Sequence, residues 1–183
     1  MLEEKPIDYE IKVDGVENTF EGGAVRYSKN KGRFDLIEED VMIRLLNSIK
    51  EYETININQY DIMQTAYDGK YIEAVIKLTC YHYSDAVCDG RTTTFDTKQI
   101  FKYFCLMTSD LAIHFQKGAE KYGERNCEKG IPLWSFRDSG LRHMTQYFEG
   151  RTDEPHHIST IWNFVMADWT INNHPERCSD VIR

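Results

Sequence analysis

The last third of the chain holds a helix-length segment that is apolar on nearly every side. Residues 155–172 follow the helical repeat, with Pro155 at a favoured first position and Thr152 or Asp153 as the expected cap. The large apolar side chains that surround this helix are Ile158, Ile161, Trp162, Phe164, Val165, Met166 and Trp169. A helix that is apolar all round has to be buried by other elements. The sequence therefore predicts a bundle with this helix at its centre.

Four further segments have the periodicity of helices that could bury the central one. We expect helices over residues 34–50, 70–83, 98–122 and 133–148. Gly123 is expected just past the end of the third. A strand stays open for residues 70–83, and residues 52–70 are ambiguous. Residues 1–33 and 85–97 are rich in turn signals and predict loops. The expected fold class is all-α.

Charge and composition limit the classes of function. The 183 residues, 41% hydrophobic and 13% aromatic, suit one domain with a real core. The net charge of −8 disfavours direct DNA or RNA binding and membrane-surface binding, but it leaves room for a nucleotide in a local basic pocket. Five scattered cysteines, a charged start and no membrane-length apolar run indicate reduced thiols in a cytoplasm.

The predicted helix over residues 133–148 has two distinct faces. Its apolar face holds Phe136, Gly140, Leu141, Met144, Tyr147 and Phe148. The opposite face holds Asp138, Arg142, Thr145 and Glu149, which fall within about 60° of one another by the helical repeat. Two carboxylates and an arginine on one stripe could hold a metal and a phosphate. The plainer interpretation is the solvated face of an amphipathic helix.

The central helix carries one narrow polar line. His156, Thr160 and Asn163 fall at positions i, i+4 and i+7 of an otherwise apolar surface. Buried polar groups without partners are destabilising by about 1–3 kcal/mol each, so these three need partners. Either they form a hydrogen-bonded network in the core, or they face a cavity that holds a polar ligand.

Two basic, glycine-containing stretches could contact phosphates. One runs from Gly118 to Gly130, with Lys121, Arg125, Asn126 and Lys129 as donors, and the other spans residues 22–33. Each alone could also be an ordinary solvated loop. Neither matches the P-loop or the dinucleotide fingerprint, so those folds are not indicated.

Several short motifs follow one another in a fixed order. They are Gly23-Ala-Val-Arg26, Lys31-Gly-Arg-x-Asp35, Gly118-Ala-x-Lys-Tyr-Gly-x-Arg-Asn126, Lys129-Gly-Ile-Pro, Asp138-Ser-Gly-x-Arg-His143, Asp153-Glu-Pro-His156 and Trp162-Asn163. This series resembles the dATP/dGTP diphosphohydrolase family, a MazG-like group associated with phages and prophage-bearing bacteria. The resemblance covers about residues 20–46 and 108–175.

The resemblance implies a MazG-like helical bundle, usually a homo-oligomer, that acts in a bacterial or phage-infected host cytoplasm. It implies Mg²⁺- or Mn²⁺-dependent hydrolysis of a purine (deoxy)nucleoside triphosphate, dGTP or dATP, to monophosphate and pyrophosphate. The implied catalytic residues are Asp138, Glu154, His156 and Lys121. The implied nucleotide- and phosphate-binding residues are Lys31, Arg33, Arg125, Asn126, Lys129, Arg142 and Asn163. The implied metal ligands are Asp138, Glu149, Glu154 and Glu124.

Departures from the family pattern shape the remaining expectations. We expect one domain, 1–183, with an N-terminal loop strap (1–33). Residues 47–107 are longer than the link expected in shorter relatives, so we expect an insertion there (about 47–107). Gln116 stands where relatives often carry glutamate, and an amide is a weaker ligand for Mg²⁺. An alternative is therefore a protein that binds a nucleotide or a nucleotide signal without cleaving it. A purely structural helical protein is a third.

Overall fold

The computed structural model describes residues 17–19, 25–27, 32–84 and 91–179. Residues 1–31 and 32–183 form two separate units, and each is described by itself. In the first unit, β1 (Glu17–Thr19) pairs antiparallel with β2 (Val25–Tyr27), with Asn18 opposite Arg26. The prediction of a loop alone was wrong here, because three-residue strands are too short to show a periodic pattern.

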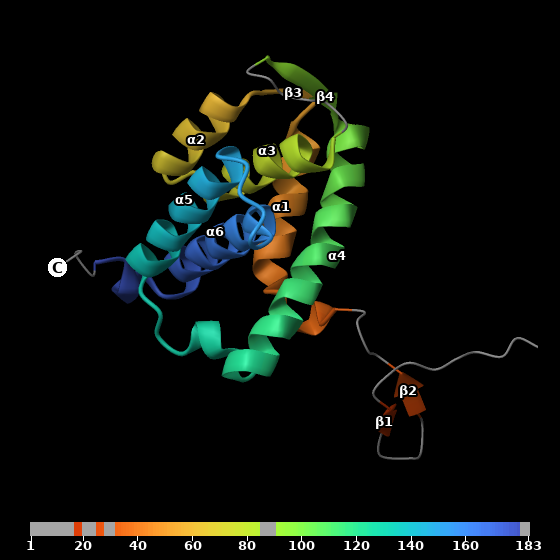
Figure 1. Cartoon of the computed structure of the whole chain (residues 1–183), viewed down its shortest axis with the longest axis vertical. Coiled ribbons are helices and arrows are strands. Elements are labelled where there is room, and N and C mark those ends of the chain that lie inside the picture. Colours follow the sequence, from red (N-terminus) through yellow and green to blue (C-terminus); the bar gives the residue numbers. More distant parts are fainter. Residues whose placement is uncertain (1–16, 20–24, 28–31, 85–90, 180–183) are drawn as a thin grey trace, which may run out of the picture. The chain divides into compact units, whose positions relative to one another are not determined.

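The second unit is a bundle of helices with one small strand pair (Figure 1). Its helices, within the described residues, are α1 (Glu39–Glu51), α2 (Gln59–Tyr67), α3 (Tyr71–Tyr83), α4 (Thr97–Tyr122), α5 (Leu133–Phe148) and α6 (His156–Asn173). Short 3-10 turns lie at Phe34–Leu36, Asn126–Glu128 and Pro175–Cys178. The all-α prediction is confirmed, and the helices expected at 70–83, 98–122 and 133–148 begin and end within a residue of their predicted bounds.

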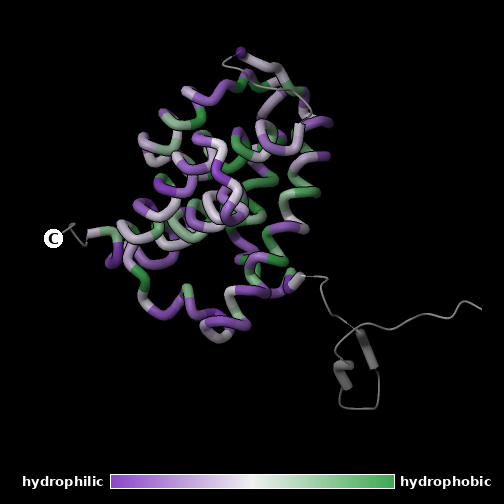
Figure 2. Tube along the Cα trace, viewed as in Figure 1, coloured by the Kyte–Doolittle hydropathy of each residue, from purple (hydrophilic) through white to green (hydrophobic). Residues whose placement is uncertain are grey.

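Helix α6 is the central element of this unit. Helices α1, α3, α4 and α5 all pack against it. Ile161, Phe164 and Val165 have no exposed surface, and Ile158 and Trp169 are also buried. Figure 2 shows that apolar and hydrophilic residues alternate along the helices, as packing of amphipathic helices around a buried one requires. The chain itself covers α6, so the apolar surface of this helix does not by itself call for a partner, and the homo-oligomer stays a prediction.

Two segments near the edge of the bundle differ from the sequence prediction. The ambiguous stretch 52–70 contains β3 (Thr54–Ile57) and α2, and the expected loop 85–97 contains β4 (Thr93–Asp96). The two strands pair antiparallel with Ile55 opposite Phe95, and both of these side chains are buried. The strands lie about 40 residues apart in the sequence, so nothing local to either one announces its partner.

The start of α4 is capped by side chains, whereas the start of α6 has no side-chain cap. At the start of α4, Asp96 accepts a hydrogen bond from the backbone N–H of Gln99, and the Gln99 side chain accepts one from the backbone of Asp96. Gly123 ends this helix with a φ of 87°, as expected. The cap predicted for α6 was wrong. The helix begins at His156 after Pro155, and Asp153 contacts the His156 ring instead of the helix backbone.

A glycine sets the distance between α5 and α6. A Cβ atom on Gly140 would lie 2.5 Å from Cε1 of Phe164, far inside ordinary contact distance. Only a residue without a side chain lets α5 lie this close to α6. This close packing places His143 of α5 beside the first turn of α6. No helix in the described part of the chain has the length and apolar character to cross a membrane.

Candidate functional site

Two adjoining hollows lie along the C-terminal half of α4. The first, which we call the polar cleft, has a volume of about 640 Å³ and lies between α4, α5 and the start of α6. The second, the apolar cavity, has a volume of about 350 Å³ and lies between the end of α4 and the 3-10 turn at Asn126–Glu128. Four residues line both: His114, Gly118, Tyr122 and Trp162. One ligand of sufficient length could therefore occupy both hollows.

The polar cleft carries two lysines on one face of α4. Lys117 and Lys121 both line it and are exposed. Among the residues that the structure describes, neither forms an ion pair with a carboxylate. Nζ of Lys121 lies 4.8 Å from the ring centroid of Tyr122, and a hydrogen bond with Tyr122 raises the pKa of this lysine. Both ammonium groups can therefore bind an anion that enters the cleft.

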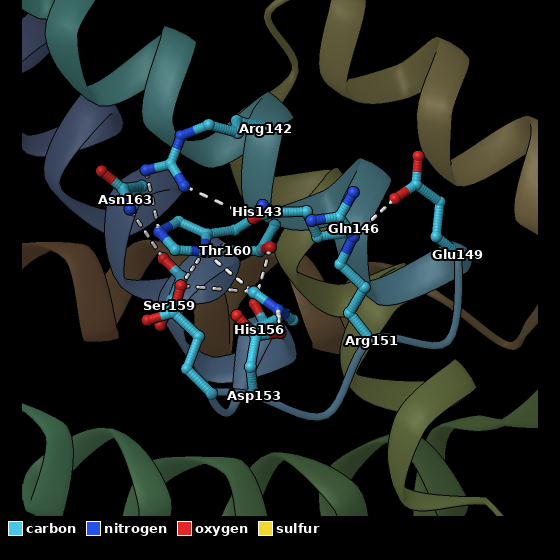
Figure 3. Close-up of polar contacts among 11 residues, drawn as sticks. Arg142, His143, Gln146, Glu149, Arg151, Asp153, His156, Ser159, Thr160 and Asn163 are labelled. Atoms are coloured by element: carbon cyan, nitrogen blue, oxygen red, sulfur yellow. Dashed lines mark hydrogen bonds and ion pairs between the residues drawn. The ribbon is translucent and has the colours of Figure 1, made fainter.

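Two histidines, labelled in Figure 3, form a close cluster with Glu154 at the wall of the cleft. Nδ1 of His143 lies 3.1 Å from Nδ1 of His156. Oε1 of Glu154 lies 3.3 Å from the first of these atoms and 3.5 Å from the second. Both imidazoles are buried, while the side chain of Glu154 is 46% exposed. The cluster therefore combines nitrogen and oxygen ligand atoms with access from solvent.

Three histidines near the cleft are uncharged at neutral pH. Burial lowers the pKa of His114 and of His157 to about 4. Burial, and then the charge of Arg142, also lowers the pKa of His143. The ring of His157 stacks on His82 with a centroid distance of 3.5 Å. The positive charge in the cleft thus comes from the lysines, and His114, His143 and His157 act as neutral donors, acceptors or ligands.

The structure brings some of the expected site residues to these hollows. Lys121, Glu154 and Asn163 line the polar cleft, and Arg125 and Asn126 line the apolar cavity. Nη1 of Arg125 is also 2.7 Å from Oε1 of Glu128.

Other expected residues lie away from the cluster. Asp138 is exposed on the outer face of α5 and lines neither hollow. Glu149 pairs with Arg151 at 2.9 Å, and Glu124 pairs with Arg33 at 2.7 Å. Lys129 is exposed.

Three further residues from the sequence analysis need separate placement. Lys31 lies outside the described residues. Nη2 of Arg142 lies 3.2 Å from Nε2 of His143, so Arg142 contacts the cluster from its solvent side. Gln116 donates to Glu120 along α4 at 2.9 Å, and neither residue lines a hollow.

The polar line on α6 combines the two interpretations left open above. Thr160 donates to the backbone oxygen of His156, and Asn163 donates to that of Ser159, both at 2.8 Å. These bonds stay within the helix and do not form a network between helices. His156 belongs to the cluster, and Asn163 lines the polar cleft. Two of the three polar residues, His156 and Asn163, therefore lie at the candidate site, and Thr160 does not.

Sequence reasoning missed four residues of the site: His114, Lys117, His143 and His157. A signal for the first two was present, since Asp110, His114, Lys117 and Lys121 are spaced i, i+4, i+7 and i+11 on α4. That spacing marks a polar stripe on one face of the helix. His143 sits beside the apolar face of α5, and nothing local distinguishes it from a core histidine.

One comparison with known proteins finds a match. Residues 91–179 match the family model described as dATP/dGTP diphosphohydrolase, N-terminal. No curated protein matches the chain. No solved structure matches it either, so the MazG-like part of the fold prediction stays a prediction. The matched segment contains the whole lining of the polar cleft. Over residues 91–179, this chain is therefore similar to the dATP/dGTP diphosphohydrolase, N-terminal, family.

Proposed function

We propose that this protein hydrolyses a purine deoxynucleoside triphosphate, dATP or dGTP, to monophosphate and pyrophosphate. One observation carries the proposal: an apolar cavity and a cation-bearing cleft adjoin and share four lining residues. A nucleotide has the same two-part chemistry, with a flat apolar base at one end and a chain of phosphates at the other. The family match supports nucleotide hydrolysis as the activity.

The apolar cavity suits the base. Its volume of about 350 Å³ is within the range of small-ligand pockets, and Phe115, Ile131 and Trp162 supply apolar walls. Aromatic side chains bind flat π systems by stacking. Asn126 lines the same cavity and can donate to and accept from the edge of a base. This supports the nucleotide-binding role that the family resemblance implies for Asn126.

The polar cleft suits the phosphates. Lys117 and Lys121 would balance the negative charge of the triphosphate and of the departing pyrophosphate. By contrast, Arg33 and Arg125 already have carboxylate partners in this unit, which weakens their case as phosphate ligands. The lysines are therefore the cations that we assign to the substrate.

A divalent cation is part of this proposal, because it would screen the phosphates and activate a water. Mg²⁺ takes oxygen ligands, commonly one or two carboxylates together with substrate phosphates. Of the four carboxylates expected as ligands, only Glu154 lies at the cleft, where its neighbours are imidazoles. The cluster of two imidazoles and one carboxylate thus fits Mn²⁺ better than Mg²⁺.

Product analysis tests the activity directly. Incubation with dATP or dGTP and Mn²⁺ should release pyrophosphate and the nucleoside monophosphate, which phosphorus NMR separates from orthophosphate. Recovery of intact nucleotide after tight binding would favour the non-hydrolytic alternative. The motive for that alternative is weaker now, because Gln116 does not line the cleft.

The lysine assignment has a matched control on the same helix. Lys121 lies over the ring of Tyr122, and Lys102 lies over the ring of Tyr103 in the same way. Lys121→Met should lower kcat/KM about tenfold or more, because it removes a charge-assisted contact to phosphate. Lys102→Met should leave kcat/KM unchanged. Equal losses in both variants would remove the support for a phosphate role.

A further inference from the structure

The cluster at the start of α6 has the dimensions of a metal site. The three ligand atoms of His143, His156 and Glu154 form a triangle with edges of 3.1, 3.3 and 3.5 Å. Nitrogen and oxygen ligands lie about 2.0–2.2 Å from a bound transition metal, so neighbouring ligand atoms are about 3.0–3.5 Å apart. The three atoms already stand at the separations that one shared ion would impose. We propose that they bind one divalent transition-metal ion of the Mn²⁺ to Zn²⁺ series.

The neighbours of His156 prepare it as a ligand. Its Nε2 lies 3.0 Å from Oδ1 of Asp153. A carboxylate can only accept at this position, so the ring proton resides on Nε2. Nδ1 is then left with its lone pair facing His143 and Glu154. A histidine that binds metal through one nitrogen commonly donates from the other to a carboxylate, which fixes the tautomer and the ring orientation.

The surroundings of His143 show what the metal would displace. Arg142 is a permanent donor, so Nε2 of His143 accepts from it and Nδ1 carries the ring proton toward His156 and Glu154. A metal ion bound to Nδ1 of His143 would replace that proton, and the ring proton would then reside on Nε2. Nε2 would become a donor that faces the guanidinium of Arg142, which is also a donor. Arg142 must then turn away. Its side chain is exposed and its other contact, with Gln146, is a long one of 3.4 Å, so this movement is easy.

The ligand types decide the class of ion. Two imidazoles and one carboxylate suit Mn²⁺, Fe²⁺, Co²⁺ or Zn²⁺, whereas Mg²⁺ and Ca²⁺ require oxygen ligands. Three protein ligands leave positions open, and His143 and Glu154 both line the polar cleft. Water or a phosphate oxygen can reach the ion from there. The metal site stands on these residues alone, and only its part in hydrolysis rests on the proposed function.

Cobalt binding tests the site without reference to activity. The full chain is freed of metal with EDTA, exchanged into chelator-free buffer and titrated with CoCl₂ while its visible absorption is recorded. We expect a saturable signal at one Co²⁺ per chain that Zn²⁺ abolishes and that excess Mg²⁺ leaves unchanged. A signal that never saturates at one equivalent, or one that Mg²⁺ removes at equal concentration, overturns the proposal.

Single substitutions locate the ion. Asp153→Asn should weaken Co²⁺ binding about 10–100-fold, and Glu154→Gln at least as much. The side chain of Asp153 is largely exposed and that of Glu154 about half exposed, so these variants should fold. His174→Gln is the matched control, because it removes a histidine whose Nδ1 lies 3.0 Å from a carboxylate oxygen outside the cluster. It should bind Co²⁺ as the unchanged protein does. If Glu154→Gln and His174→Gln behave alike, the cluster is not the site.

Two further results separate this proposal from the proposed function. Arg142→Met should bind Co²⁺ as tightly as the unchanged protein or more tightly, because no cation then opposes the metal-bound tautomer of His143. A large loss in this variant would contradict the tautomer argument. If Co²⁺ binds as expected while no nucleotide is cleaved, the metal site stands and the hydrolase proposal fails.

Discussion

Replacing Gly140 by alanine tests the contact that holds α5 against α6. The added methyl would lie 2.5 and 2.8 Å from two ring carbons of Phe164 and 3.2 Å from Cβ of Asn163. Phe164 is fully buried, and its ring stacks on Tyr71 with a centroid distance of 5.4 Å, so it has little room to retreat. Overpacking of this kind is destabilising by about 1–3 kcal/mol. Alanine regains up to about 1 kcal/mol of helix propensity over glycine.

The net effect of Gly140→Ala should be a loss of about 1–2 kcal/mol in the free energy of unfolding. For a domain of this size the melting temperature would fall by about 2–8 °C. Urea denaturation followed by circular dichroism measures the change as a lower midpoint at constant slope. Gly118→Ala is the control, because a Cβ there meets nothing within 4 Å and should stabilise α4 slightly. Stability unchanged or raised by Gly140→Ala would refute the close-packing argument.

Three other predictions concern the cleft and its histidines. Gly118→Ala should leave the fold intact but weaken dATP binding measured by calorimetry, because the added methyl would enter the wall that the two hollows share. Unchanged affinity for dATP would contradict a nucleotide that spans both hollows. His114 and His157 have folded pKa values of about 4, below the usual value near 6.5, so the stability they confer is full above about pH 6.5 and is lost as pH falls toward 4. From this source, the free energy of unfolding measured in urea should be about 3–4 kcal/mol lower at pH 5 than at pH 7, and a flat profile would contradict the burial of these rings. Gln116→Glu should leave Co²⁺ affinity unchanged and destabilise α4 by about 0.2–0.5 kcal/mol through repulsion with Glu120, whereas tighter binding would place residue 116 near the metal.

Local patterns were enough to locate most of the helices. Helices α3, α4 and α5 follow from the 3.6-residue repeat, and the bound at Gly123 follows from glycine's tolerance of positive φ. The segment expected as one helix over 34–50 is a 3-10 turn followed by α1, which begins only at Glu39. The strand pair β3–β4 was missed, because each strand depends on a partner about 40 residues away.

The candidate site shows where such patterns stop being informative. Asp138 and Glu149 were attractive because they share a stripe with Arg142, yet that stripe faces solvent. His143, one position from the stripe, points instead at the first turn of α6. A rotation of about 100° per residue separates the two outcomes, and only the packing partner of α5 decides between them.

The sequence by itself determined that α6 is central, because a helix that is apolar all round cannot be stable against water. The sequence also contains the ordered series of short motifs that resembles the dATP/dGTP diphosphohydrolase family, and these motifs include the lysine, histidine and asparagine residues of the site. Tertiary structure alone decided which of these residues meet. The glycine contact at Gly140 sets how closely α5 approaches α6, and that approach brings His143 within 3.1 Å of His156. Distances between side chains on different helices depend on how the helices pack, and no local pattern encodes them.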